Sequence, residues 1–290
     1  MPFFRRLMAV LDMIKFHHTV FALPFALLAM AWAAQGWPGW RACAGVLAAM
    51  VGARSAAMTF NRLADRKYDA QNPRTSKWPL STGAVSLPFA WGFFLVSVAL
   101  FFAAAWFLNP LCLALSPLAL LVILGYSYTK RFTVLCHLIL GFADGISAPG
   151  AWIAVTGTLE GSAPAWWLCA ALTAWIAGFD YLYSLQDREF DKEHGLHSWP
   201  ALYGVVSTLW VSAGLHVMTL GFMAVAAFGV GVGWIFWAAL AATGMALVYE
   251  HLIVRPSDLS RLGAAFFSVN GYISVGLFLA GVTDLWLRSR

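Results

Sequence analysis

The sequence predicts an all-α membrane protein in which nine transmembrane helices pack in one bundle. Three observations predict this class. Hydrophobic residues make up 61% of the 290 residues and charged residues only 11%, whereas soluble domains carry roughly 25% charged residues. The mean hydropathy is +0.74. The apolar residues also gather in runs close to the length of about 20 residues that a helix needs to cross a bilayer.

The predicted spans are nine apolar runs bounded by glycine, proline and charged residues. The formal net charge of +5 does not indicate a nucleic-acid partner, because the basic residues stand between the apolar runs and not along one polar face. The lipid bilayer is the expected partner. The runs cover about 19–36, 41–61, 85–107, 110–128, 133–157, 164–186, 206–229, 232–251 and 264–286.

The basic residues fix an orientation. With the N-terminus in the cytoplasm, fourteen Lys and Arg residues flank cytoplasmic span ends and three flank outer ends, while Arg54 falls within the second span. An excess of basic residues marks the cytoplasmic side of a membrane protein. We therefore expect an integral protein of a bacterial or archaeal cytoplasmic membrane. The long, charged connections 62–84 and 187–205 face the cytoplasm.

These two long connections begin with similar sequences. Residues 65–69 read DRKYD and residues 187–191 read DREFD, so the copies lie 122 residues, or four predicted spans, apart. A repeat of four helices followed by one extra helix explains the count of nine. The prediction is a single domain over 1–290, with repeat halves at about 17–130 and 133–255 and a last helix at about 264–286.

The aspartates of the repeat are candidate metal ligands. Asn61, Asp65 and Asp69 are spaced i, i+4, i+8, and Asp187 and Asp191 repeat the carboxylate spacing. On one continued helix such carboxylates repel each other unless a cation lies between them. Oxygen ligands favour Mg²⁺, which completes its coordination with water and phosphate oxygens. Two such pairs around one opening would suit a diphosphate held by two metal ions. The alternative is solvated helix ends whose aspartates pair with arginines.

Basic and aromatic residues at the same membrane face fit a diphosphate. Lys130 ends the fourth span and Arg74 lies in the first long connection, so both are candidate diphosphate ligands. Ordinary positive-inside anchoring is the alternative, and it is the preferred interpretation for Lys77 and Arg131. Tyr126 lies four residues before Lys130 on the same helical face. Its ring could stabilise a cation or lie at the membrane interface.

Three charged residues are predicted deeper in the bilayer. Arg54 lies seven residues before Asn61, Asp180 lies seven before Asp187, and Asp144 falls within the fifth span. An ionised side chain at such depth needs a polar cavity or a partner. Arg54 and Asp180 are expected to line the cavity of the aspartates, with an ion pair between them as the alternative. Asp144 is open between buried hydrogen bonding and a catalytic or acceptor-binding role. Its neighbouring glycines predict a kinked, closely packed helix.

These residues resemble the UbiA-type intramembrane prenyltransferases. The family's first motif, Asn-x-x-x-Asp-x-x-x-Asp, is matched at 61–69, and its second, Asp-x-x-x-Asp, at 187–191. The resemblance runs from about residue 15 to the C-terminus, and is greatest to the branch that prenylates 4-hydroxybenzoate. Trp199 and Asp144 depart from the pattern of that branch. Further matching stretches are 72–75 (NPRT), 79–83 (PLSTG), 126–131 (YSYTKR), 149–157 (PGAWIAVTG), 180–187 (DYLYSLQD) and 195–200 (GLHSWP).

The resemblance implies a nine-helix bundle with a central cavity open to the lipid and to the cytoplasm. It implies Mg²⁺-assisted loss of diphosphate from a polyprenyl diphosphate and attack by an aromatic acid, in quinone biosynthesis. It does not determine whether the acceptor is 4-hydroxybenzoate or a naphthoate or futalosine-pathway acid, nor does it determine the prenyl chain length. A CDP-alcohol phosphotransferase is a rival, although residues 144–149 (DGISAP) lack the arginine of its Asp-Gly-x-x-Ala-Arg run. A secondary transporter is a second rival, but its sites usually lie near the membrane midplane.

The first testable prediction concerns orientation. Because basic residues are concentrated at one set of span ends, a reporter active only in the cytoplasm should be active in the 62–84 connection and inactive at the C-terminus. Activity at both positions in otherwise intact protein would contradict the nine-span topology. A periplasm-active reporter at the same two positions is the matched control and should give the reverse pattern.

Overall fold

The computed structural model describes residues 8, 10, 13, 14 and 21–288. All the regular secondary structure in this part is helical, apart from one isolated β-bridge between Arg255 and Asp258. The helices are α2 (Leu23–Ala34), α3 (Trp40–Ala64), α4 (Arg66–Gln71), α5 (Leu87–Leu108), α6 (Pro110–Thr129), α7 (Cys136–Gly145), α8 (Ser147–Thr156), α9 (Ala163–Ser184), α10 (Arg188–Glu193), α11 (Trp199–Val230), α12 (Trp234–Ile253), α13 (Leu262–Ala264) and α14 (Asn270–Arg288).

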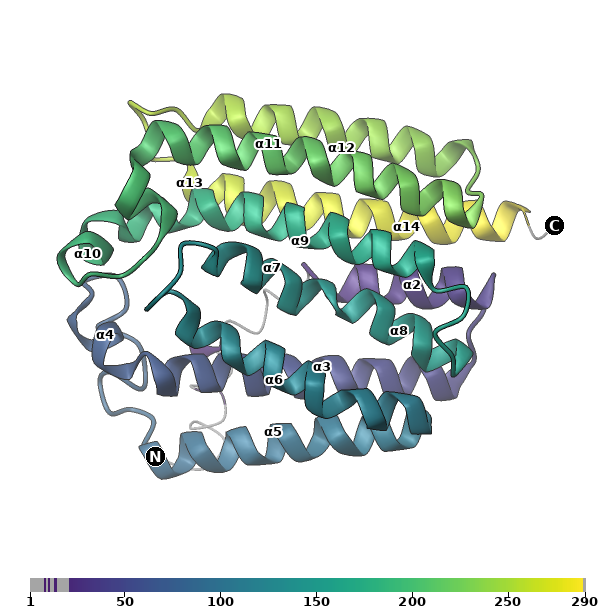
Figure 1. The fold of residues 1–290 in the computed structure, drawn as a ribbon, viewed down its shortest axis with the longest axis horizontal. Helices are drawn as coiled ribbons and strands as arrows, with labels where there is room; N and C mark the ends of the chain where they lie inside the picture. Colours follow the sequence, from purple (N-terminus) through teal and green to yellow (C-terminus); the bar gives the residue numbers. More distant parts are fainter. Residues whose placement is uncertain (1–7, 9, 11–12, 15–20, 289–290) are drawn as a thin grey trace.

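The long helices lie side by side in one bundle (Figure 1). In this view α5 lies along one side, α12 along the other, and α9 runs between them. The short helices α4 and α10 project from the same end of the bundle, and the C-terminal end of α14 lies at the opposite end. The two copies of the aspartate motif are therefore gathered at one end.

The predicted all-α membrane class is confirmed. Among the described residues, eight helical segments are long and apolar enough to cross a membrane, and they correspond to the predicted spans from 41–61 to 264–286. The first predicted span, 19–36, begins outside the described residues. Its described part is α2, which has 12 residues. This length is short of the roughly 20 residues that a span requires.

The core is formed around α2 and α9. Buried aromatic side chains of α2 contact both α9 and α12. Phe25 packs against Trp175 of α9 with ring centroids 5.2 Å apart, and Trp32 packs against Phe236 of α12 at 5.3 Å. Edge-to-face contacts of this kind add to the dispersion energy of close packing. The α9 helix is buried along most of its length, so it is the central support of the bundle.

The predicted kink in the fifth span is confirmed. The span is divided into α7 and α8 at Ile146. Pro149 has no N–H to donate to the carbonyl of the residue four positions earlier, and its ring would clash with that carbonyl. Gly141 and Gly145 lie against the backbone carbonyls of Thr173 and Cys169 on α9. Apart from the neighbouring residues and backbone of its own helix, no atom of the described residues lies within 4 Å of a Cβ placed on Gly150. Close packing therefore involves the first two glycines and not the third.

This contact gives a stability prediction. Gly141→Ala should lower the free energy of unfolding by about 1–3 kcal/mol, because its methyl group would overlap the Thr173 carbonyl oxygen. Thermal unfolding of the purified protein in detergent measures the change. Gly150→Ala, in the adjoining helix, is the matched control and should be neutral or slightly stabilising. Equal melting temperatures for both variants would contradict the predicted backbone contact.

Candidate active site

The helices do not run unbroken through either aspartate motif. In the first copy α3 ends at Ala64 and α4 begins at Arg66, with Asp65 at the junction. In the second copy α9 ends at Ser184, a 3₁₀ turn covers Leu185–Asp187, and α10 begins at the next residue. The prediction of one continued helix through each motif is wrong at these junctions.

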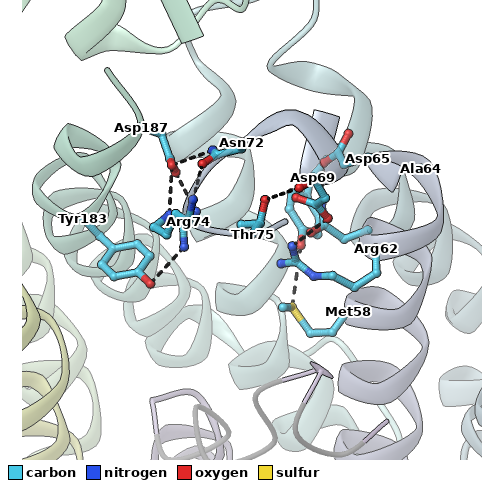
Figure 2. A network of polar contacts seen from close by, with 12 residues as sticks. Met58, Arg62, Ala64, Asp65, Asp69, Asn72, Arg74, Thr75, Tyr183 and Asp187 are labelled. Atoms are coloured by element: carbon cyan, nitrogen blue, oxygen red, sulfur yellow. Dashed lines mark hydrogen bonds and ion pairs between the residues drawn. The ribbon is translucent and has the colours of Figure 1, made fainter. Parts of the chain in front are cut away.

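A basic side chain from the first motif's loop joins the two motifs (Figure 2). The Arg74 guanidinium donates from Nε to Asp187 Oδ1 at 2.9 Å and from Nη2 to Oδ2 at 2.6 Å. Asn72 donates a further hydrogen bond to Asp187 Oδ1 at 2.9 Å. A two-pronged contact between guanidinium and carboxylate is strong and directional. Burial alone would lower the pKa of Arg74, but its bonds with Asp187 raise that pKa above its usual value.

The first motif is held by two other arginines. Asp65 Oδ1 accepts from Arg131 Nη2 at 2.9 Å, and its other oxygen accepts from the Asn61 amide at 3.1 Å. Asp69 Oδ2 pairs with Arg62 Nη1 at 3.2 Å. Burial raises the pKa of the Asp69 carboxyl, against the opposing effect of the nearby guanidinium. Arg131, for which ordinary positive-inside anchoring was the preferred interpretation, therefore also binds the first motif.

The last aspartate is the most buried of the four. Asp191 has no exposed surface, and its Oδ1 lies 2.7 Å from Lys130 Nζ. The Lys130 side chain remains one-third exposed. A carboxylate removed from water needs such a partner. Lys130 thus faces the second motif.

All four aspartates line one cavity at this end of the bundle. A second, deeper cavity shares six lining residues with it, including Asn61, Arg74 and Lys130. The predicted convergence of the two motifs is therefore confirmed as geometry. The alternative of aspartates paired with arginines is also correct in part, since three of the four make such pairs. Unlike ordinary solvated helix ends, these pairs enclose a cavity.

The deeper cavity contains the remaining candidates. Its wall includes Arg54, Tyr126, Asp144 and Asp180. Asp180 Oδ2 lies 2.7 Å from His137 Nδ1. The alternative of an ion pair between Asp180 and Arg54 is therefore wrong.

Asp144 supplies the carboxylate near Arg54. Its Oδ2 lies 3.6 Å from Arg54 Nη1. Of the two roles left open for Asp144, buried hydrogen bonding has no support, because the described residues supply no hydrogen bond to its carboxyl group.

An apolar cavity continues from this polar one. The two share Arg54, Met58, Tyr126, Leu140 and Asp144, and beyond them the lining is mostly aliphatic. The Tyr126 hydroxyl lies 3.8 Å from the Met58 sulfur at the boundary. The cavity therefore runs from a charged end, past a few polar groups, into an apolar region.

Three residues near the site were absent from the candidates predicted from the sequence. Arg62 pairs with Asp69 and lies over the Trp78 ring at 3.9 Å. His137 lies seven residues before Asp144. The same spacing related Arg54 to the first motif, so it could have identified His137 as a candidate. Asn72 lies in the NPRT stretch, which indicated only the family.

The donor set suits Mg²⁺. No group of three histidine, cysteine, aspartate or glutamate side chains in the described ranges is already arranged to hold a metal ion. Mg²⁺ does not need such a cage, because it commonly binds through one or two carboxylates together with water and substrate phosphates. Two carboxylate pairs around one cavity, without a histidine or thiolate among its lining residues, fit this ion.

Comparison with known proteins gives the family. The model of the UbiA prenyltransferase family matches residues 22–274. A 4-hydroxybenzoate octaprenyltransferase of Azotobacter vinelandii is 33% identical over 231 residues, covering 80% of this chain and 77% of the relative. This chain belongs to the UbiA prenyltransferase family.

Solved structures agree with this assignment. The apo structure of a UbiA homologue from Aeropyrum pernix K1 is 34% identical and has a TM-score of 0.85, covering 92% of this chain and 98% of the homologue. A UbiA homologue from Archaeoglobus fulgidus, bound to DMAPP and Mg²⁺, shares the fold at a TM-score of 0.64 and 20% identity. The coverage is 94% of this chain and 99% of that one.

Proposed function

We propose that this protein transfers a polyprenyl group from a polyprenyl diphosphate to an aromatic acid such as 4-hydroxybenzoate. One observation carries the proposal: four aspartates from two copies of one motif line a single cavity that continues into an apolar one. The Azotobacter relative named for 4-hydroxybenzoate supports the acceptor class. The Archaeoglobus structure with DMAPP and Mg²⁺ supports a metal-bound prenyl diphosphate as donor.

The reaction breaks the bond between the allylic carbon and a diphosphate oxygen, and the electron pair leaves with the diphosphate. A ring carbon of the acceptor then forms a bond to the allylic carbon, and the ring proton is released. Mg²⁺, proposed as two ions, would neutralise charge on the leaving diphosphate when bound. Asn61, Asp65 and Asp69 would hold metal from the first motif. Asp187 and Asp191 would do so from the second.

The basic side chains have a role in the same step. Lys130 and Arg74 lie beside the second motif, so each is placed to donate a hydrogen bond to a diphosphate oxygen held there. Donors already fixed near developing charge stabilise a transition state without further reorganisation. Positioning of the leaving group therefore uses the same residues that hold the aspartates in place.

The deeper part of the cavity suits the acceptor and the prenyl chain. Arg54 provides a guanidinium whose fork matches a carboxylate. Tyr126 lies at the boundary with the apolar cavity, where its ring can stabilise an allylic cation. The aliphatic lining beyond it suits an isoprenoid chain, and low water content protects the cation from hydrolysis.

The topology belongs to the same proposal. Nine spans, made of two four-helix repeats and a last helix in one domain, place both motifs on the cytoplasmic side. This arrangement is supported by α4 and α10 at one end of the bundle and by the C-terminal end of α14 at the other. The two rivals from the sequence, a transporter and a CDP-alcohol phosphotransferase, are disfavoured by the family match.

The metal ligands give a direct test. With Mg²⁺ and a prenyl diphosphate, each of Asp65→Asn, Asp69→Asn, Asp187→Asn and Asp191→Asn should lower kcat by on the order of 100-fold or more, because an amide is a weaker metal ligand than a carboxylate. Chelation of divalent ions should abolish turnover. Product formation from labelled prenyl diphosphate measures both effects.

The basic residues provide the comparison for this series. Lys130→Ala and Arg74→Ala should reduce turnover less, because the metal shares the diphosphate charge with them. Melting temperatures near that of the wild type show that a variant is folded. Near-normal turnover in all four aspartate variants would rule out their proposed role.

A second test concerns the acceptor. Arg54 lies seven residues before Asn61 on α3, roughly 10 Å deeper along a helix that rises 1.5 Å per residue. It is therefore too deep for a direct diphosphate ligand. Arg54→Lys should raise KM for the aromatic acid by about tenfold, with little change for the prenyl diphosphate, because a point charge replaces a planar fork. A larger change in KM for the diphosphate would assign Arg54 to the donor.

A further inference from the structure

Asp144 is a carboxylate that the proposed chemistry does not use. It lies near the end of α7, next to the break at Ile146, and lines both the polar and the apolar cavity. About a quarter of its side chain is exposed, at 24%. Among the described residues it receives no hydrogen bond, and its nearest charged neighbour is Arg54. A partly buried carboxylate without hydrogen bonds retains the capacity to accept them.

The partner Arg54 is similarly incomplete. Its Nη1 lies 3.6 Å from Asp144 Oδ2, which is beyond hydrogen-bond length. Its Nε is buried without a hydrogen-bond partner among the described residues. The two groups thus balance each other's charge. The Arg54 guanidinium keeps unused hydrogen-bond donors, and the Asp144 carboxylate keeps unused acceptors. Both are directed at the same space, because both line the two adjoining cavities.

The charges around this space are already balanced. Asp180 is bound to His137, and Arg62 is bound to Asp69. Arg54 and Asp144 carry one positive and one negative charge. An acceptor with a bare carboxylate would place a second negative charge beside Asp144, with a single guanidinium for both. Where water is scarce, an uncompensated charge of this kind is strongly unfavourable.

We propose that Asp144 determines acceptor specificity by selecting a ring substituent that presents a hydrogen-bond acceptor and a hydrogen-bond donor side by side. The acceptor atom binds Arg54, and the donor atom binds Asp144. A carboxamide has this pattern, and so does a carboxylate with an amino or hydroxyl group on the neighbouring ring carbon. A bare carboxylate fills only the Arg54 half.

The physical basis is the cost of an unmatched polar group. A site that forms a hydrogen bond with a substrate discriminates against an analogue that lacks the group, since the buried partner is then left unsatisfied. The Asp144 carboxylate accepts a hydrogen bond from a substrate that carries a donor, and it repels a substrate that carries a bare carboxylate. Both effects act in one direction, so a single residue can change the preference.

The inference rests on the proposed function, and its test compares two nearly isosteric acceptors. 4-Hydroxybenzamide replaces one carboxylate oxygen of 4-hydroxybenzoate with an NH₂ group. With geranyl diphosphate, Mg²⁺ and the full chain in detergent, wild type should have the higher kcat/KM for the amide. 2-Amino-4-hydroxybenzoate should likewise exceed 4-hydroxybenzoate. Asp144→Asn should lower the amide-to-acid ratio by on the order of tenfold, since its side-chain NH₂ can donate to a carboxylate.

Two further variants make the test specific. Asp144→Leu removes both the charge and the hydrogen-bond acceptor, so it should also lower the ratio. Glu160→Gln removes an exposed carboxylate between α8 and α9 and should leave the ratio unchanged. The inference would be overturned if the amide-to-acid ratio in both Asp144 variants stayed within about twofold of the wild-type ratio. It would also be overturned if the wild type preferred 4-hydroxybenzoate. Asp144 would then be only a structural partner of Arg54.

Binding measurements separate this inference from the proposed function. If wild type prenylates neither compound, the proposed function fails, but calorimetric titration of each compound into wild type and Asp144→Asn still tests the selectivity. Tighter binding of the amide in wild type, reduced by the substitution, supports the inference without turnover. An equal affinity ratio in the two proteins overturns it. The wild-type preference remains decisive if an Asp144 variant does not fold.

Discussion

Pairing of carboxylates with basic side chains at one end of the bundle is the constraint on which the rest of the structure depends. Four aspartates brought to one cavity would repel each other strongly if they stood alone. Three of the four pairs join residues that are distant in sequence: Arg74 and Asp187 are separated by 113 residues, and Arg131 and Asp65 by 66. Lys130 and Asp191 form the third. Each of these three pairs therefore fixes a tertiary contact. Together they hold the loop after α4, the end of α6 and the start of α10 around one opening.

The sequence predicted the elements whose signal is local. Long apolar runs are sufficient to identify spans, and repeated DRKYD and DREFD stretches are sufficient to relate the two motifs. The helix break at Asp65 was missed because an i, i+4 pattern shows which residues share a face and not where the helix ends. The break at Ile146 was predicted because the glycines near Asp144 carry a local signal.

The ion pairs could not be assigned from the sequence. Arg62, Arg74 and Arg131 are all basic residues at one membrane face, so the positive-inside rule explains each of them equally well. Which arginine meets which aspartate depends on how α4 and α10 turn after α3 and α9, and tertiary packing decides that. The deeper pairs show the same limit. Arg54 and Asp180 were expected in one cavity, which is correct, but each has a different partner from the one considered.

The break between α7 and α8 connects the fold with the acceptor end of the cavity. Backbone groups freed at a helix break within a membrane protein must be surrounded by protein or by a cavity. Here Gly141 and Gly145 bring α7 against α9, and Asp144, between them in sequence, lines the cavity. The glycines that permit close packing thus also fix the position of the carboxylate.

Charge balance applies at both ends of the cavity and explains why their ligands differ. At the open end, four aspartates meet four basic residues, so metal ions alone or diphosphate alone would upset the balance. The two together bring opposite charges, and the proposed substrate complex can enter as one unit. At the deep end one guanidinium meets one carboxylate, and no metal ion is proposed there to offset a second anion. A ligand at that depth must therefore bring its own balance of donor and acceptor groups, which is the requirement that Asp144 adds to the carboxylate recognition proposed for Arg54.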